Sequence, residues 1–404
     1  MLSCVACKSK NSPLSETEKL ENKLILESIK IIKVNGQDRV LFDYPFRCVF
    51  SEKFKPELSN YAAALQTSKS LFKKLHSKGL AAQFHAEIVK GIEDDHLELL
   101  SPEQTKIELT KPHSFSFLNY TQKVSAKGHS IRPVSNSSAN HPSGSANSWL
   151  PKGSAILGDL VSIFESFRLF SWVLISDIKR CYRSIISTDQ SNRARLHLYP
   201  LKPLDPHCTE YVILKYKCAT YGDTPIATLL EMIMVHFVAP RIDDKLAKEF
   251  ALVKRFVDDI IGSGDDKDKM VVAMLSLERA LNSLGFTLKK IISNNFWHYT
   301  TPNLSSFGPA WQPEADDESV PDEVIFGHQW CIAKDTLKPN FKLYTGKKLR
   351  GTYAGDVLQN TDLSGVIVTK RLMASLCAQV FELDGCWSSI LRPILKSYLQ
   401  KHAK

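Results

Sequence analysis

The sequence lacks several features that would place a protein in a class at once. No apolar run approaches the length of a membrane-spanning helix, and the opening residues MLSCVACK are too short for a signal peptide. The cysteines are nine, an odd number, and they are scattered without the spacing of a disulfide framework. We therefore expect an intracellular, cytoplasmic protein that is not inserted in a membrane.

Metal and charge signals are also weak. Cys4 and Cys7 form a CxxC pair, but no second pair follows to complete a zinc site. The formal net charge of +9 favours a polyanionic partner, although many proteins with a mild basic excess bind no nucleic acid. With 404 residues, 43% of them hydrophobic, the chain can bury the cores of two or three subdomains.

One short stretch stands out, KRFVDDIIGSG at 254–264, because it places two adjacent carboxylates between apolar residues. The other Asp-Asp pairs of the chain have charged, polar or glycine neighbours on at least one side, as solvated turns usually do. Burying unpaired carboxylates is costly. Asp258 and Asp259 therefore either lie at an exposed hairpin turn or are neutralised by cations.

The segments around this stretch follow a definite order. The predicted elements are a strand over 170–178, a helix with Thr224 as N-cap and Pro225 as first residue, two short strands that meet at Asp258-Asp259, a helix over 269–284 closed by Gly285, and a strand over 286–292. Strand, helix, strand, strand, helix, strand is the ferredoxin-like, split βαβ pattern. The order predicts an α+β fold.

In that topology the first strand lies beside the central hairpin, so Asp177 can meet Asp258 and Asp259 at one end of the sheet. Three carboxylates would repel one another there unless divalent cations lay between them. Mg²⁺ prefers oxygen ligands and holds substrate phosphates, which points to two-metal phosphoryl transfer. Unrelated turn aspartates are the alternative, and we would favour it for Asp258-Asp259 taken alone.

Two other segments are informative about organisation. Residues 57–79 place apolar side chains on one helical face, and Gly79 is a plausible C-terminal stop. Residues 135–154 are rich in Ser, Asn, Pro and Gly and predict a long loop. Loops of this length are often functional.

Several ordered motifs resemble the reverse transcriptases of retroelements, most closely the BEL/Pao group of long-terminal-repeat retrotransposons. SDIKRCYRSI (176–185) is similar to the first palm motif, RFVDDIIGSG (255–264) to the Tyr-x-Asp-Asp motif, and LNSLGFTLKKIISN (281–294) to the stretch after it. FGHQWCIAKDTL and TKRLMASLCAQVFELDG downstream, and KGHSIRPVSNSSA with SANSWLPKG upstream, resemble further family segments. The resemblance covers most of the chain and implies a right-hand polymerase with fingers, a ferredoxin-like palm and a thumb or connection.

The resemblance also implies domain boundaries. They are an N-terminal extension with the start of the fingers over 1–110, fingers over 111–168, a palm with fingers insertions over 169–337, and the start of a thumb or connection over 338–404. We expect no ribonuclease H or integrase after Lys404, and no Asp-Thr/Ser-Gly protease motif occurs. The last segment resembles a region termed the Pao retrotransposon peptidase, from which we infer no proteolysis.

Site residues follow from the resemblance one by one. Asp177, Asp258 and Asp259 match the catalytic, metal-binding carboxylates, which implies two Mg²⁺ ions, with Mn²⁺ as a substitute. Tyr182, five residues after Asp177, matches the aromatic that crowds a ribose 2′-hydroxyl; a core tyrosine is the alternative. Arg132 matches the fingers arginine near the incoming triphosphate, where a planar guanidinium suits phosphate oxygens.

The sequence departs from the family pattern at three places. Phe256 replaces the usual Tyr and so removes a hydroxyl beside the primer. Asn136 stands where the family usually has Asp. Gly222 opens a shortened second palm motif, in which only two residues separate Gly from Pro. This motif shapes the nucleotide pocket in the family. Its shortening therefore predicts a less efficient polymerase.

Binding of nucleic acid is expected downstream of the palm. The stretch 338–353 is basic and aromatic and contains Lys347, Lys348 and Arg350. Such a composition suits a phosphate backbone with stacking platforms. A solvated loop fits it nearly as well.

These features together predict an RNA-directed DNA polymerase of a retroelement that takes an RNA or DNA template–primer and deoxynucleoside triphosphates. One alternative is a nucleic-acid-binding remnant of such an element with impaired catalysis, and another is an RNA-dependent RNA polymerase, which Tyr182 disfavours. The resemblance implies that the protein could also be packaged in virus-like particles within the cytoplasm. The sequence leaves the oligomeric state open.

Overall fold

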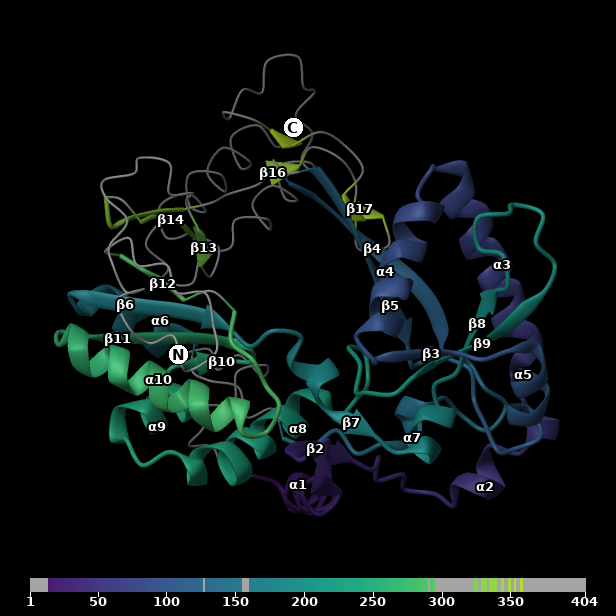
Figure 1. Ribbon diagram of the computed structural model, residues 1–404, viewed down its shortest axis with the longest axis horizontal. Helices are drawn as coiled ribbons and strands as arrows, with labels where there is room; N and C mark the ends of the chain where they lie inside the picture. Colours follow the sequence, from purple (N-terminus) through teal and green to yellow (C-terminus); the bar gives the residue numbers. More distant parts are fainter. Residues whose placement is uncertain are drawn as a thin grey trace, which may run out of the picture. The chain divides into compact units, whose positions relative to one another are not determined.

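Helices and strands are interspersed along the chain (Figure 1). The chain divides into two units. The computed structural model describes residues 14–125, 128–154, 160–289, 291–294, 323–325, 328–332, 334–339, 343–344, 348–349, 352–353 and 357–358. Unit 1 comprises Met1–Gly158, Ile178–Leu252 and Ala273–Leu288, and unit 2 comprises Asp159–Asp177, Val253–Val272 and Lys289–Lys404. The predicted α+β class is confirmed.

Unit 1 combines helices with small sheets. Its α-helices are α1 (Glu16–Glu27), α2 (Phe50–Lys53), α3 (Tyr61–Ser77), α4 (Ala81–Glu93), α5 (Pro102–Glu108), α7 (Asp189–Arg193), α8 (Ile226–Ile233) and α9 (Lys245–Leu252), while α10 (Lys267–Asn282) contributes to both units. Its shorter helical turns are η1 (Pro56–Leu58), η2 (Ala146–Trp149), η3 (Cys181–Ser184), η4 (Met234–Val238) and η5 (Ala239–Arg241). Its strands are β1 (Ile29–Val34), β2 (Gln37–Phe42), β3 (Leu97–Leu99), β4 (Phe117–Ser125), β5 (Gly128–Asn136), β7 (Ile186–Ser187), β8 (His197–Pro200) and β9 (Tyr211–Tyr216). The strands pair as β1-β2-β7, β3-β9-β8 and the hairpin β4-β5.

The β4-β5 hairpin is held by two helices. α3 packs against β4, and α4 packs against β5. The rings of Phe84 and Tyr199 both meet Phe72 edge-on, inside an apolar cluster that also includes Leu118 and Ile131 from the hairpin. Arranged in this way, aromatic pairs add to the stabilisation that burial alone provides. The packing fixes β5, the strand that carries Arg132.

Unit 2 is built on a four-stranded antiparallel sheet. Its strands are β6 (Trp172–Asp177), β10 (Arg255–Phe256), β11 (Asp259–Gly264) and β12 (Ile292–Ser293), in the order β10-β11-β6-β12. Taken in chain order, these are the second, third, first and fourth strands, which is the spatial order of a ferredoxin-like sheet. Figure 1 shows β6 and β11 lying side by side.

An apolar cluster covers this sheet. α6 (Leu160–Leu169) packs against β11 and contributes Ile163 and Phe167. Trp330 is fully buried in the same cluster, and the ring of Phe167 meets it edge-on. Trp330 belongs to a second antiparallel sheet, and the remaining short strands form two-stranded pairs. These strands are β13 (Glu323–Ile325), β14 (His328–Cys331) and β15 (Thr336–Pro339), then β16 (Leu343–Tyr344) with β19 (Val357–Leu358), and β17 (Lys348–Leu349) with β18 (Thr352–Tyr353).

Most predicted elements are confirmed, with differences at their ends. β6, the helix over 61–77 and the helix over 267–282 lie where the sequence places them, and both Gly79 and Gly285 have a positive φ just after a helix. The strand predicted over 286–292 is wrong in extent, because β12 covers only Ile292–Ser293. Among the described helices, none combines the length and the hydropathy needed to cross a bilayer.

The start of the helix after Thr224 is also corrected. α8 begins at Ile226 with Pro225 at its N-cap. The Thr224 backbone N–H donates to Asn147 Oδ1 at 2.9 Å, and the Thr224 hydroxyl donates to the Asn147 carbonyl at 3.4 Å. Thr224 therefore bonds to a distant loop and does not cap the helix.

Candidate active site

The predicted carboxylates lie on neighbouring strands of unit 2. β11 runs antiparallel to β6, and in this register Asp259 lies directly opposite Asp177. Asp258 is the residue just before β11. Residues opposite each other in an antiparallel pair have Cβ atoms roughly 4.5–5.5 Å apart, so like charges at these positions repel. The register thus brings Asp177, Asp258 and Asp259 to one end of the sheet, while their metal-binding role stays a prediction.

A strained hairpin turn holds Asp258. β10 and β11 are joined by the two-residue loop Val257-Asp258, because Phe256 pairs with Asp259. Val257 has φ +57°, in the left-handed region that β-branched residues rarely adopt. Arg255 is buried and donates a guanidinium N–H to the Val257 carbonyl. Backbone strain of this kind costs on the order of 1–3 kcal/mol and persists where the surroundings determine the conformation.

The charges of the cluster are only partly balanced. Lys289 Nζ donates to Asp177 Oδ2 at 2.8 Å, and the Lys289 backbone N–H donates to the Asp177 carbonyl at 2.8 Å. The pKa of the Asp259 carboxyl is raised to about 6, first by loss of hydration and then by the negative charges of Asp258 and Asp177, while Lys289 opposes the rise. Asp259 is nevertheless an exposed residue, so solvent and ions can reach it. An added cation would lower the energy of this cluster.

The donor set suits a divalent ion that shares its coordination with substrate. Within the described ranges, no group of three or more His, Cys, Asp or Glu side chains is placed to hold a metal ion by itself. Mg²⁺ usually takes one or two carboxylates and fills its remaining positions with water and phosphate oxygens. The facing pair Asp177 and Asp259, with Asp258 adjacent, fits that mode and not an all-protein cage.

Phe256 lies next to the carboxylates in the sheet. It is the partner of Asp259 in the β10-β11 register, and its half-buried ring packs against the apolar cluster of unit 2. A phenylalanine suits this position because the ring contacts apolar neighbours. The predicted contact of Phe256 with the primer stays a prediction.

The other predicted substrate residues belong to unit 1. Arg132 is exposed on β5 and lies opposite Thr121 of β4. Tyr182 lies in η3 and is buried, with its ring edge-on to Tyr221 at a centroid distance of 4.6 Å. The burial of Tyr182 agrees with the core-tyrosine alternative and does not test its contact with a sugar.

Gly222 occupies a position that only glycine fits. Its φ is +101°, and a Cβ added there would lie 2.8 Å from the backbone oxygen of Ser135. Any side chain would therefore force the backbone apart, since real Cβ atoms do not approach an oxygen so closely. The close approach places the loop that contains Gly222 directly on the end of β5.

Several predicted residues lie outside the described part of the chain. Lys347 and Arg350 are among them, as are Cys4 and Cys7. Lys348 is described as the first residue of β17. The predicted role of the 338–353 stretch therefore stays a prediction, as do the predicted domain boundaries.

Sequence reasoning missed two functional candidates. Lys289 had a usable signal, because it lies in the LKK stretch that the strand pattern directs toward the carboxylate end of the sheet. Arg195 had none, since its buried partners Tyr44 and Asp223 are far from it in sequence. Only folding brings these three side chains together.

Comparisons with known proteins give distant similarities. No protein-family model matches the sequence, and no curated protein matches it. The native prototype foamy virus protease–reverse transcriptase is 14% identical with a TM-score of 0.35, over 51% of this chain and 23% of that chain. The foamy viral protease–reverse transcriptase dRH in complex with double-stranded DNA is 11% identical with a TM-score of 0.46, over 79% of this chain and 44% of that chain. This chain thus spans less than half the length of each matched chain.

Proposed function

We propose that this chain is the polymerase part of a retroelement, an RNA-directed DNA polymerase that extends a primer with deoxynucleoside triphosphates. The observation that carries the proposal is the register that sets Asp259 opposite Asp177, with Asp258 in the adjoining turn. The sheet around them has the ferredoxin-like strand order of a polymerase palm. The ordered sequence motifs point to a reverse transcriptase, and to its BEL/Pao group.

Each carboxylate has a distinct task in this proposal. Asp177 and Asp258 are the more direct metal ligands, and Asp259 adds negative charge beside them. Two bound divalent ions would activate the primer hydroxyl and stabilise the charge of the leaving pyrophosphate. Lys289 holds the Asp177 side chain in place through its 2.8 Å bond. Asp258 follows Val257 in the strained turn, and the Val257 carbonyl accepts a hydrogen bond from the Arg255 guanidinium.

The substrate contacts are proposed from unit 1. Arg132 is exposed on a well-packed strand, as a residue that binds triphosphate oxygens must be. Tyr182 would lie under the sugar and exclude a 2′-hydroxyl. Gly222 lets a backbone loop approach the end of β5 closely.

The test is primer extension on an RNA template with Mg²⁺ or Mn²⁺. Asp258→Asn should abolish extension and leave the protein folded, because the amide keeps the shape but loses the metal-binding charge. Asp243→Asn, at an exposed aspartate outside the carboxylate cluster, is the matched control and should retain activity. Full activity in a folded Asp258→Asn protein would refute the assignment.

A non-catalytic, nucleic-acid-binding remnant is the second candidate. The shortened motif at Gly222 favours it, since the segment that shapes the nucleotide pocket has lost residues. This candidate predicts salt-sensitive binding of a primer–template with no extension by the unmodified protein. The same assay therefore separates the two functions.

A further inference from the structure

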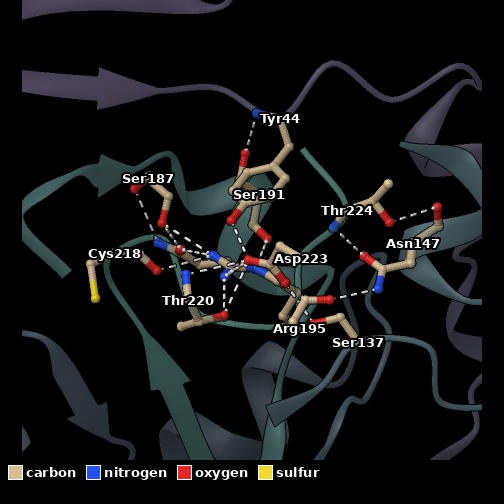
Figure 2. A network of polar contacts seen from close by, with 12 residues as sticks. Tyr44, Ser137, Asn147, Ser187, Ser191, Arg195, Cys218, Thr220, Asp223 and Thr224 are labelled. Carbon is tan, nitrogen blue, oxygen red and sulfur yellow. Dashed lines mark hydrogen bonds and ion pairs between the residues drawn. The ribbon is translucent and has the colours of Figure 1, made fainter. Parts of the chain in front are cut away.

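A buried polar network anchors the shortened motif in unit 1 (Figure 2). Asp223, the residue after Gly222, has a fully buried carboxylate. It accepts hydrogen bonds from Arg195 Nη1 at 2.7 Å, Ser137 Oγ at 2.6 Å, Thr220 Oγ1 at 3.1 Å and the Tyr44 hydroxyl. These donors come from four separate segments, so Asp223 ties the motif to the strand that ends before Ser137.

The network is complete enough to keep two charges buried. Arg195 is only 1% exposed, and its guanidinium also donates to Thr220 Oγ1, Ser187 Oγ, Asn192 Oδ1 and the Cys218 carbonyl. A buried ion pair is tolerated when additional hydrogen bonds satisfy the remaining donors. Burial raises the pKa of Tyr44 well above its usual value, so its hydroxyl stays protonated and donates to Asp223.

A second clamp holds the same loop from its other side. Asn147 Nδ2 donates to the Gly222 carbonyl at 2.7 Å, and Asn147 Oδ1 accepts from the Thr224 N–H at 2.9 Å. The Asn147 backbone N–H in turn donates to the Ser137 carbonyl at 3.3 Å. One side-chain amide thus bonds the backbone on both sides of Asp223. Figure 2 shows Asn147 bonded to Thr224, and Ser137 beside the Arg195–Asp223 pair.

We propose that Asn147 and Ser137 are positioning residues that hold the Gly222 loop against the end of β5 and so fix one wall of the nucleotide pocket. The inference rests on the proposed polymerase function. The contact between Gly222 and Ser135 lies three residues from Arg132 on the same strand. A displaced loop would therefore disturb β5, the strand that carries Arg132, the residue proposed to bind the triphosphate. The long loop over 137–149 supplies the contacts that a motif with so few residues cannot make within itself.

The variants are chosen to spare the buried charges. Replacing Asp223 would leave Arg195 unpaired in the interior and destabilise the region. A change in nucleotide binding could then not be assigned to the position of the loop. Asn147→Ala removes three hydrogen bonds of a partly exposed side chain, two to the Gly222 loop and one to Ser138 Oγ. Ser137→Ala removes one hydroxyl and serves if the first variant folds poorly. Asn140→Ala is the matched control, because Asn140 is exposed in the same loop and offers its backbone carbonyl to Asn60.

Steady-state primer extension on an RNA template measures whether the position of the Gly222 loop affects nucleotide binding. Asn147→Ala should raise the KM for the deoxynucleotide about tenfold, the scale of the two lost bonds to the Gly222 loop, with kcat unchanged and the protein still folded. Hydrogen exchange of the Gly222–Thr224 amides should accelerate in the free variant, whereas Asn140→Ala should match the unmodified protein in every measurement. Equal KM values for Asn147→Ala and Asn140→Ala in an active enzyme would overturn the inference and leave the polymerase proposal standing.

A binding measurement separates failure of the inference from failure of the function. Complexes are formed with a dideoxy-terminated primer–template and the matching deoxynucleotide, and the dissociation constant of the nucleotide is measured. If the unmodified protein binds the nucleotide and Asn147→Ala binds it about tenfold more weakly, the positioning role holds. If the unmodified protein neither binds nucleotide nor extends primer, the polymerase function is wrong and the positioning role falls with it.

Discussion

Asp259→Asn should make the metal-free protein more stable above pH 6, even though it damages the proposed catalytic site. The pKa of Asp259 rises from 3.8 to about 6 in the folded protein, because the carboxyl loses hydration and faces Asp258 and Asp177. Between those pH values the folded protein binds more protons than the unfolded chain. Stability therefore falls as the pH rises through this window, and the loss persists at higher pH.

The size of the effect follows from the pKa change. A rise from 3.8 to about 6 corresponds to about 3 kcal/mol of differential free energy. Asp259 is exposed, so solvent and salt screen its repulsion, and about 1 kcal/mol is a suitable expectation. The asparagine has nearly the same shape and carries no charge. The variant should gain this amount at pH 8 and only a small part of it at pH 4.

Urea unfolding followed by tryptophan fluorescence, in a chelating buffer at both pH values, measures the gain. Mg²⁺ should then stabilise the unmodified protein more than the variant, since an ion that binds only the folded state adds stability by mass action. Asp243→Asn, at an exposed aspartate outside the cluster, controls for the loss of one negative charge. An equal gain in both variants, or one that does not depend on pH, would refute the repulsion on which the metal site is argued.

Three further outcomes are expected. Tyr182→Ala should raise the ratio of ribonucleotide to deoxynucleotide incorporation about tenfold to a hundredfold. Because Tyr182 is buried, the variant should also have a lower melting temperature. An unchanged sugar preference in the folded variant would mean that another residue selects the sugar. Asp223→Ala should destabilise unit 1 by about 3–5 kcal/mol in urea, because Arg195 is left buried and unpaired; a loss below about 1 kcal/mol would contradict the network. Affinity for a primer–template should fall steeply with salt, and Lys348→Ala should lower the salt slope by about 1; a flat dependence would reject charge-driven binding.

Local sequence patterns were enough to predict the fold class and the meeting of the three carboxylates. β-Branched runs and helix stops fixed the order of the elements, and that order allows one antiparallel arrangement in which Asp177 faces the Asp258-Asp259 hairpin. Local signals sufficed because each element carries its own periodicity. They were less exact at element ends, as the late start of α8 and the short β12 show.

Which distant polar side chains bond to one another depended on how the chain packs. Thr224 has the chemistry of a helix cap, yet it bonds to Asn147, which lies 77 residues away in the sequence. Arg195, Asp223 and Tyr44 come from three segments with no common motif, and each would be read alone as an ordinary polar residue. Their pairing depends on burial, because a charge that leaves water must find its partners wherever the packed chain brings them. Sequence periodicity records which face of an element is buried, but it does not record what that face will meet.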